Sequence, residues 1–212
     1  MTPPPTVAAI VVIFAIVDGE LSVLLIHRTA PPEEGLWALP GARWDGSESL
    51  EEAAARTLEK ETGARGLYLE QLFTVSGLDP AAPAVAVAYF ALVDAEAVRL
   101  REEREWPPAW HRVASLPRLA FENNVVIEQA LARVRAKLEY TNIAYGLLPE
   151  RFTLRELHET YESILGRPLD RRNFRKRLLA SEVVEATGER RREGAHRPAL
   201  MYRFLKREPV FL

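Results

Sequence analysis

The sequence predicts an α+β fold with two units, a larger unit built on a β-sheet and a smaller, mainly helical unit that ends in a β-hairpin. β-rich apolar runs recur up to residue 113, and helical spacing takes over from residue 122. Charge changes along the chain as well. Residues 1–140 hold 13 basic and 20 acidic residues, a formal charge of −7, whereas residues 141–212 hold 15 basic and 10 acidic residues, a formal charge of +5. We therefore predict a domain boundary between residues 140 and 141 and a polyanionic partner for the second unit.

The overall composition excludes several classes of protein. The chain has 212 residues, 48% of them hydrophobic, and no cysteine, so a disulfide scaffold, a thiolate zinc site and a cysteine nucleophile are excluded. The most apolar run, Ala8–Val17, is half of the ~20 residues that a membrane-spanning helix needs. No basic residue precedes this run, which disfavours a signal peptide. We expect a buried strand there, no membrane partner and a cytoplasmic protein.

The elements of the first unit follow one another in a clear order. Two β-rich runs, 7–16 and 21–27, are joined by Asp18-Gly19, which is a hairpin signal. An amphipathic helix is predicted over 50–62, with Gly63 as its C-cap. Further strands are predicted over 67–75 and 84–93, with a short one near 109–113, and a helix over 122–140 closes the unit.

The second unit follows a short connector, 141–150, that can hold one helical turn. Thr153 and Glu156 form a capping box at the start of a helix that ends at Gly166, and Asp170 caps a second helix over 171–181. Residues 182–187 and 199–204 are predicted strands on either side of a basic loop. Two helices joined by a short turn and followed by such a hairpin are typical of a winged helix-turn-helix.

The second helix of this unit has the chemistry of a DNA-reading helix. At ~100° per residue, Phe174, Leu178 and Ser181 face the preceding helix, and Arg172, Asn173, Lys176 and Arg177 face outward. Arg and Lys donate to guanine O6 and N7, and Asn pairs with adenine, so double-stranded DNA is the expected partner. Double-stranded RNA is less suitable, because its narrow major groove does not admit a helix. The alternative is a solvated basic surface.

The predicted DNA-contacting set extends from this helix to its neighbours. We place Arg190, Arg191, Arg192 and Arg197, together with His196, in the hairpin loop, where cations can contact phosphates or the minor groove. The complete candidate set is Thr153, Arg155, Arg171, Arg172, Asn173, Arg175, Lys176, Arg177, Arg190, Arg191, Arg192 and Arg197.

The segment 39–64, LPGARWDGSESLEEAAARTLEKETGA, resembles the Nudix box, G-x5-E-x7-R-E-U-x-E-E-x-G-U with U aliphatic. The positions that match are Glu48, Arg56, Leu58, Glu61, Gly63 and Ala64. The departures are Ala42 for Gly, Thr57 for Glu and Lys60 for Glu. The resemblance implies a Nudix-type α/β/α sandwich with a mixed sheet. It also implies that positions 57, 60 and 61 are those at which the family's helix carboxylates hold a divalent metal against a pyrophosphate.

The departures remove most of that metal site. Positions 57, 60 and 61 share one helix face, and a cation such as Mg²⁺ needs oxygen ligands there. Two of the three carboxylates are absent, and Lys60 adds a repulsion of about 4 kcal/mol per unit charge at ~4 Å and an effective dielectric near 20. We therefore expect no catalytic residues, no bound metal and no required cofactor, with hydrolysis lost or much weakened.

A ligand site can survive the loss of catalysis. Lys60, with Arg43, can take over the electrostatic role of the metal, so that a nucleoside diphosphate binds without being cleaved. The resemblance adds Glu48 and Arg56, which brace the loop in the family, and the candidate effector-binding set is Arg43, Glu48, Arg56, Lys60 and Glu61. The equally weighted alternative is that Lys60 is a solvated lysine four residues from Arg56.

A degenerate Nudix domain followed by a winged helix resembles the Nudix-related transcriptional regulators of the NrtR family. The segments that carry this resemblance most specifically are 147–154 (LLPERFTL), 165–175 (LGRPLDRRNFR), 197–199 (RPA) and 202–204 (YRF). The resemblance implies a homodimeric bacterial repressor of genes for NAD metabolism, with an operator in double-stranded DNA and ADP-ribose as a nucleotide-type effector. Three alternatives stay open: a repressor of sugar-utilisation genes, an ADP-ribose hydrolase with a regulatory C-terminal domain, and a binding module without sequence specificity.

Overall fold

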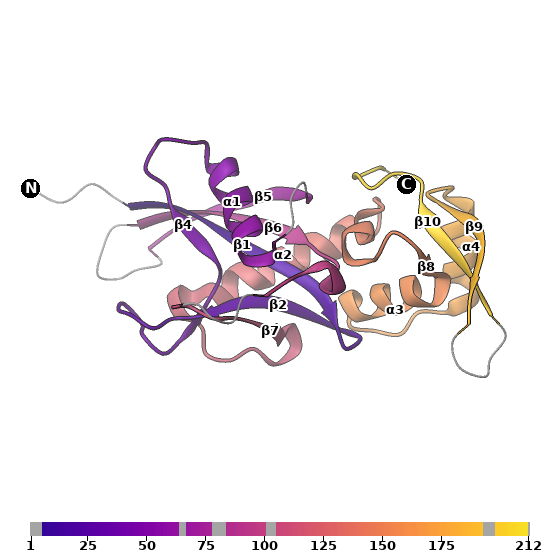
Figure 1. The fold of residues 1–212 in the computed structure, drawn as a ribbon, viewed down its shortest axis with the longest axis horizontal. Helices are drawn as coiled ribbons and strands as arrows, with labels where there is room; N and C mark the ends of the chain where they lie inside the picture. The colour runs from indigo at the N-terminus through magenta and orange to yellow at the C-terminus, as the bar shows by residue number, and fades with distance from the viewer. Residues whose placement is uncertain (1–5, 64–66, 78–83, 101–104, 193–197, 212) are drawn as a thin grey trace, which may run out of the picture.

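The computed structural model describes residues 6–63, 67–77, 84–100, 105–192 and 198–211. The chain forms an elongated molecule with a sheet-based unit at one end and a winged helix at the other (Figure 1). Within the described residues, no helix combines the length and the apolar character that crossing a membrane requires.

The first unit is built on a mixed sheet of seven strands. Its main path runs β3-β2-β1-β6-β5, with β4 paired to β1 and β7 paired to β2. β1 is parallel to β6, and every other pairing is antiparallel. The strands are β1 (Thr6–Val17), β2 (Glu20–His27), β3 (Trp37–Ala38), β4 (Gly41–Arg43), β5 (Leu69–Ser76), β6 (Ala84–Leu92) and β7 (Pro108–Arg112).

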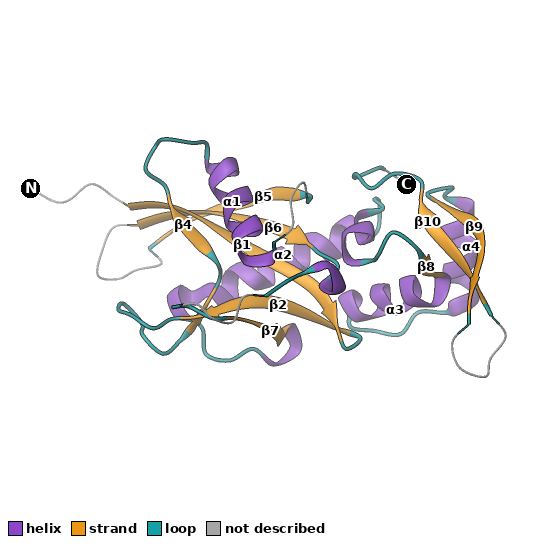
Figure 2. Cartoon of the chain, in the orientation of Figure 1, coloured by secondary structure: helices purple, strands orange, loops and turns teal. Residues whose placement is uncertain are grey.

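Helices cover both faces of this sheet, as Figure 2 shows. Because side chains alternate along a strand, Ala9, Val11 and Ile13 of β1 pack towards α1 (Leu50–Thr62), whereas Val12 and Phe14 pack towards α2 (Asn123–Lys137). Both sets of side chains are buried. The predicted α/β/α sandwich with a mixed sheet is therefore confirmed.

The second unit places two helices against a small antiparallel sheet of order β8-β10-β9. Its elements are η4 (Ile143–Leu147), β8 (Phe152–Thr153), α3 (Leu154–Leu165), α4 (Arg171–Ala180), β9 (Val184–Arg191) and β10 (Ala199–Phe204). Three short 3₁₀ turns, η1 (Ala95–Ala97), η2 (Val113–Ser115) and η3 (Ala120–Glu122), belong to the first unit. The order helix, turn, helix, hairpin confirms the predicted winged helix-turn-helix.

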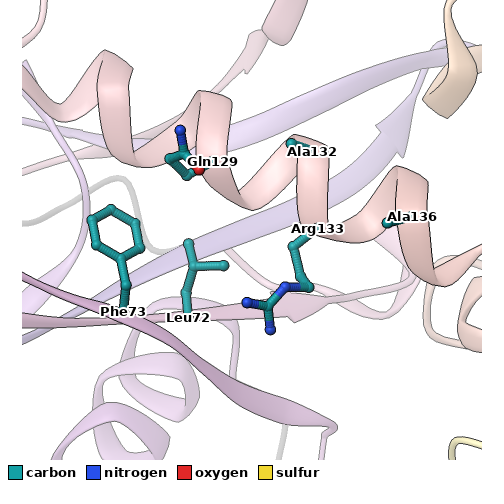
Figure 3. Close-up of a pocket in the computed structure, with 6 residues that line it drawn as sticks. All are labelled: Leu72, Phe73, Gln129, Ala132, Arg133 and Ala136. Carbon is teal, nitrogen blue, oxygen red and sulfur yellow. The ribbon is translucent and has the colours of Figure 1, made fainter.

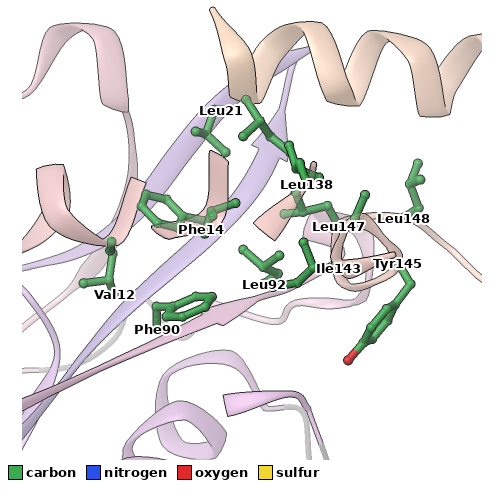
Figure 4. Packing of buried hydrophobic residues seen from close by; sticks show 14 of the residues in the cluster. Val12, Phe14, Leu21, Phe90, Leu92, Leu138, Ile143, Tyr145, Leu147 and Leu148 are labelled. Carbon is green, nitrogen blue, oxygen red and sulfur yellow. The ribbon is translucent and has the colours of Figure 1, made fainter. Parts of the chain in front are cut away.

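The connector between the units is part of the core rather than a free linker. Ile143, Tyr145 and Leu147 are buried in one hydrophobic cluster that runs from Phe14 in the first unit to Phe152 in the second (Figure 4). The backbone of the connector also passes so close to β6 that a Cβ on Gly146 would lie 2.8 Å from Leu92 Cβ. The two units therefore share apolar packing across residues 140 and 141, and the boundary placed there stays a prediction.

The chain after β10 returns to this connector and holds it. The Arg207 guanidinium donates to the carbonyl oxygens of Tyr145, Leu148 and Pro149 at 2.8, 2.9 and 3.2 Å. The Asn142 side chain donates to the carbonyl oxygens of residues 206 and 208 and accepts from the amide of residue 210. The Arg207 bonds satisfy carbonyl groups that the connector would otherwise leave without partners, and the Asn142 bonds hold the returning segment 206–210.

Most of the predicted elements are confirmed, and one prediction about the wing is wrong. The helix over 50–62 and its Gly63 cap are found with the predicted bounds, and Ser49 and Glu52 add a capping box. β9 does not end at residue 187 but continues to Arg191, because Arg190 and Arg191 pair with Leu200 and Ala199 of β10. Arg190 and Arg191 therefore lie in a strand and not in the loop. Arg197 and His196 lie outside the described residues.

Candidate nucleic-acid interface and ligand site

The turn between α3 and α4 is fixed by packing and by hydrogen bonds at both helix ends. Phe174 of α4 stacks edge-on against His158 and Tyr161 of α3, with ring centroids 5.1 Å apart in both cases. His158 is buried, and its Nε2 lies 3.0 Å from the carbonyl oxygen of Leu169 in the turn. Asp170 accepts a hydrogen bond from the amide of residue 173, which caps α4 as predicted. The angle at which α4 leaves α3 is thereby set.

The outward side of α4 carries a dense group of cations. Arg171, Arg172, Asn173, Arg175, Lys176 and Arg177 are all exposed. Within the described residues, none of these six side chains makes an ion pair or a side-chain hydrogen bond. The opposite side is packed as predicted: Leu178 is buried, and Ser181 donates to the carbonyl oxygen of Leu178. A partner can therefore bind the cations of α4 without breaking an ion pair among the described residues.

The basic residues of the wing differ from those of α4, because two of them are already bonded within the protein. Arg191 forms an ion pair with Glu156, the carboxylate that also caps α3. Arg190 donates to the carbonyl oxygen of Pro198 at 3.3 Å, and Arg192 is exposed at the end of the described part of the wing. Arg191 thus ties β9 to the start of α3. Because Glu156 lies 35 positions away in the chain, no local sequence pattern predicts this ion pair.

Two further candidates for DNA contact, Thr153 and Arg155, are already bonded to glutamates of α3. Thr153 is only 4% exposed, and its hydroxyl accepts from the amide of Glu156 and contacts the Glu156 carboxylate at 3.0 Å. Arg155 pairs with Glu159 at 2.7 Å. Sequence reasoning missed two other cations of this unit, Arg151 and Arg203, which pair with Glu189 and Glu185 at 2.6 Å. Among the described residues of this unit, the cations with no ion pair or side-chain hydrogen bond therefore gather on α4, with Arg167 before it and Arg192 on the wing as the others.

The loop before α1 is tied to the helix by an ion pair. The guanidinium of Arg56 binds the Glu48 carboxylate, with Nη2 2.5 Å from Oε1, and Trp44 Nε1 donates to the Glu48 carbonyl oxygen at 2.6 Å. The hydrogen bond to Glu48 raises the pKa of Arg56. Hydrogen bonds from Ser47 lower the pKa of Asp45 in the same loop. This arrangement holds the loop that leads into α1 in a defined shape.

The face of α1 that carries positions 57, 60 and 61 does not fit a divalent metal. Thr57 is buried, and its hydroxyl donates to the Ala53 carbonyl oxygen at 2.8 Å, so it faces its own helix. Glu61 is buried and lies 3.7 Å from Lys60 Nζ. Within the described residues, no three His, Asp or Glu side chains gather in a group that could hold a metal ion. One carboxylate beside a lysine is a poor ligand set for Mg²⁺.

The remaining candidates of the ligand site lie on two elements. Lys60, in the last turn of α1, is 66% exposed. Arg43 lies on β4, which pairs with β1, and donates to Thr6 Oγ1 at 2.8 Å. Among the described residues Arg43 makes no ion pair, so the structure leaves its guanidinium charge without a carboxylate. The structure brings Glu48 and Arg56 together, and Lys60 and Glu61 together, but joins Arg43 to neither pair.

Comparison with known families agrees with this geometry. Residues 5–132 match the model of the NUDIX domain, and residues 144–204 match the model of the NrtR DNA-binding winged helix domain. The chain belongs to the NrtR family. Members of the NrtR family and this chain thus share both the domain types and their order.

Individual relatives are similar over nearly the whole chain. The ADPR responsive transcriptional repressor NtrR of Acinetobacter baylyi is 36% identical over 208 residues, which cover 95% of this chain and 83% of the relative. The crystal structure of Shewanella oneidensis NrtR complexed with a 27mer DNA is 35% identical, covers 93% of both chains and superposes with a TM-score of 0.84. The NUDIX domain of that NrtR complexed with ADP ribose is 34% identical, has a TM-score of 0.55 and covers 62% of this chain and 90% of the domain.

Proposed function

We propose that this NrtR-family protein is a transcriptional repressor that binds operator DNA through α4 and the wing, and that ADP-ribose or a related nucleoside diphosphate derivative controls this binding. The observation that carries the proposal is the row of exposed, unpaired cations on α4. A helix that presents Arg, Asn and Lys outward from a fixed helix-turn-helix can enter the major groove. The DNA complex of Shewanella oneidensis NrtR supports this assignment.

The residues of this surface take different roles in the proposal. Arg172 and Asn173, in the first turn of α4, read base edges, while Arg175, Lys176 and Arg177 contact phosphates or bases further along the groove. Arg192 contacts the backbone from the wing. Thr153, Arg155 and Arg191 act as positioning residues, because each is already bonded within the winged helix.

A binding titration tests the DNA proposal directly. We would measure fluorescence anisotropy of a labelled fragment from upstream of the protein's own gene, and of a scrambled fragment of the same length and composition. Tighter binding to the upstream fragment is expected, because specific sites are typically 10³–10⁷-fold tighter than random DNA. Equal binding to both fragments would leave only a solvated basic surface or a module without sequence specificity.

We infer that the pyrophosphate of the ligand binds beside α1 in the first unit. Lys60 supplies positive charge where the Nudix box places carboxylates, and the pair of Glu48 and Arg56 shapes the loop beside it. We infer that Arg43 adds a second cation when the ligand is present. The ADP-ribose complex of the Shewanella oneidensis NUDIX domain supports the class of ligand. We infer that the target genes are those of NAD metabolism, as the resemblance to the NrtR family implies.

Calorimetry with ADP-ribose in EDTA tests this electrostatic role. Binding without a divalent metal is expected, and Lys60→Ala should weaken it. Lys206→Ala is a matched control, since Lys206 is equally exposed and also lies 3.7 Å from a glutamate, in the other unit. Binding that strictly requires Mg²⁺, or equal affinities for the wild type, Lys60→Ala and Lys206→Ala, would refute the role of Lys60.

A Nudix hydrolase is the second candidate, because Glu61 and the Nudix fold are retained. We infer that hydrolysis is absent or weak, since Thr57 and Lys60 replace two of the three metal-binding carboxylates. Incubation of the protein with ADP-ribose and Mg²⁺ or Mn²⁺, with product separated by chromatography, checks this inference. Turnover at rates typical of enzymes, on the order of 1–10³ per second, would favour the hydrolase.

A further inference from the structure

A hollow of about 420 Å³ lies where the first unit meets the connector and the chain after β10. One wall comes from the residues before β5, the end of β6 and η1, and the other from η4, the residues before β8 and the chain after β10. None of the described candidates for DNA contact or effector binding lines it. We call it the junction hollow, and its lining includes Tyr68, Asp94, Val98, Tyr145, Glu150 and Arg207.

The junction hollow differs from the groove between α2 and β5 (Figure 3). That groove is lined by residues of the first unit alone, and its charged residue, Arg133, is already paired with Glu70 at 3.0 Å. The junction hollow instead touches both the first unit and the chain that leads to and from the winged helix. It also contains a buried polar group that no described residue satisfies.

This group is the hydroxyl of Tyr145 in η4. Tyr145 is only 5% exposed, and its hydroxyl points away from the other labelled side chains of the apolar cluster (Figure 4). Within the described residues the hydroxyl makes no hydrogen bond. Burial raises the pKa of Tyr145 to about 12, so the hydroxyl keeps its proton near neutral pH. A buried tyrosine hydroxyl usually has a hydrogen-bond partner, so the junction hollow offers a donor that lacks an acceptor.

The charged groups of the junction hollow restrict the ligand to an uncharged molecule. Asp94 accepts from the amide of residue 96 at 3.1 Å, Glu150 is exposed, and neither carboxylate forms an ion pair among the described residues. Arg207 Cζ lies 6.0 Å from the centre of the Tyr145 ring, and its guanidinium already donates to three carbonyl oxygens. The two carboxylates disfavour an anion, and Arg207 disfavours a cation. A ligand with both N–H donors and acceptors fits these groups.

The remaining lining suits a planar ring. The rings of Tyr68 and Tyr145 meet edge to face, with centroids 6.5 Å apart, and Leu67 and Val98 add aliphatic surface. The hydroxyl of Tyr68 already binds Glu70, so Tyr68 offers its ring and not its hydroxyl. Apolar walls with a few convergent polar groups are typical of small-molecule sites.

We propose that the junction hollow is a second ligand site, separate from the one beside α1, and that it takes an uncharged nucleobase or nucleoside. The planar base lies against Tyr68 and Tyr145. A carbonyl oxygen or ring nitrogen at its edge accepts from the Tyr145 hydroxyl, and its N–H groups donate to Asp94 or Glu150. Nucleobase edges carry donors and acceptors side by side, whereas the phosphate of a nucleotide would be repelled by both carboxylates.

Calorimetry in the absence of DNA tests the site, with adenosine, cytidine, uridine and their free bases as probes. The measurements use the wild type and Lys60→Ala, which removes the cation proposed for the α1 site. At least one probe should bind both proteins, and the corresponding 5′-monophosphate should bind Lys60→Ala more weakly than the nucleoside does. Tyr145→Phe removes only the hydroxyl, so it should weaken binding by ~2–12-fold, the value of one hydrogen bond, with an unchanged thermal midpoint. Glu150→Ala should also weaken binding.

Two matched controls are available outside the junction hollow. The Tyr140 hydroxyl likewise makes no hydrogen bond among the described residues, and Glu128 is an exposed glutamate without an ion pair there. Tyr140→Phe and Glu128→Ala should therefore leave binding unchanged. The proposal is overturned if no probe binds, if Lys60→Ala abolishes binding, if a monophosphate binds as tightly as its nucleoside, or if Tyr145→Phe and Tyr140→Phe bind equally well. These measurements involve neither DNA nor ADP-ribose, so failure of this site and failure of the proposed function remain distinguishable.

Discussion

Substitution of Arg172, one of the unpaired cations on α4, should weaken DNA binding, and the salt dependence of the loss distinguishes the proposed base contact from a phosphate contact. Each phosphate that a protein cation neutralises contributes about −0.9 to the slope of log K against log salt concentration. Arg172 has no ion pair among the described residues, so Arg172→Ala should make the slope less steep by about 0.9 per bound protomer if this side chain contacts a phosphate. If it reads a base edge, the substitution should instead cost ~1–3 kcal/mol on the cognate site and little on random DNA.

Arg203→Ala provides the matched comparison. Arg203 is a comparably exposed arginine of the same unit, but its guanidinium is paired with Glu185 at 2.6 Å. DNA could recruit Arg203 only by breaking that pair, so its replacement should leave both the slope and the specificity nearly unchanged. Anisotropy titrations at four salt concentrations, on cognate and random fragments, give both quantities for each variant. Equal losses for Arg172→Ala and Arg203→Ala would refute the argument that pairing within the protein selects the DNA-contacting cations.

Three further predictions concern the packing of the first unit and of the connector. Gly146→Ala should lower the free energy of unfolding by ~1–3 kcal/mol in urea titrations, because its Cβ would lie 2.8 Å from Leu92 Cβ; an unchanged midpoint would contradict the close approach. Arg207→Ala should speed proteolysis at the connector relative to Lys206→Ala, because three carbonyl oxygens lose their donor; equal cleavage rates would argue against that role. Burial raises the pKa of Glu70, but hydrogen bonds from Lys137 and Tyr68 outweigh it and hold the pKa below its usual value near 4.5. Glu70 therefore stabilises the fold above that pH, and its contribution is lost as the pH falls through the lower value of the folded state. Thermal midpoints measured from pH 7 to pH 3 should thus fall less for Glu70→Gln than for the wild type, and parallel curves would be inconsistent with this pairing.

Local signals predicted most of the fold. The hairpin at Asp18-Gly19, the helix that ends at Gly63 and the capping box of Thr153 and Glu156 all depend on residues close together in the chain, and the structure confirms each of them. The winged helix was predictable for the same reason, since each of its elements has its own start and stop signals.

The features that escaped prediction depend on contacts between distant segments. β9 extends to Arg191 because it pairs with β10 across the wing, and Arg191 also meets Glu156 on another element; no local pattern reveals that ion pair. The connector reads as a short loop of polar and apolar residues, yet the chain after β10 returns to it and bonds it through Asn142 and Arg207, and its apolar side chains are buried. Motif spacing alone therefore identified the candidate cations but could not separate those of α4, which are unpaired, from Arg191, which is already engaged.

The central claim is that ligand binding in the first unit controls DNA binding by the second. An effector can act only through different affinities for the DNA-competent and DNA-incompetent arrangements. The most direct test is a titration of the protein on its upstream DNA fragment, with and without ADP-ribose, in EDTA. We predict specific binding that weakens as ADP-ribose is added, with a smaller effect in Lys60→Ala. Specific binding that is identical at every ADP-ribose concentration would contradict the claim.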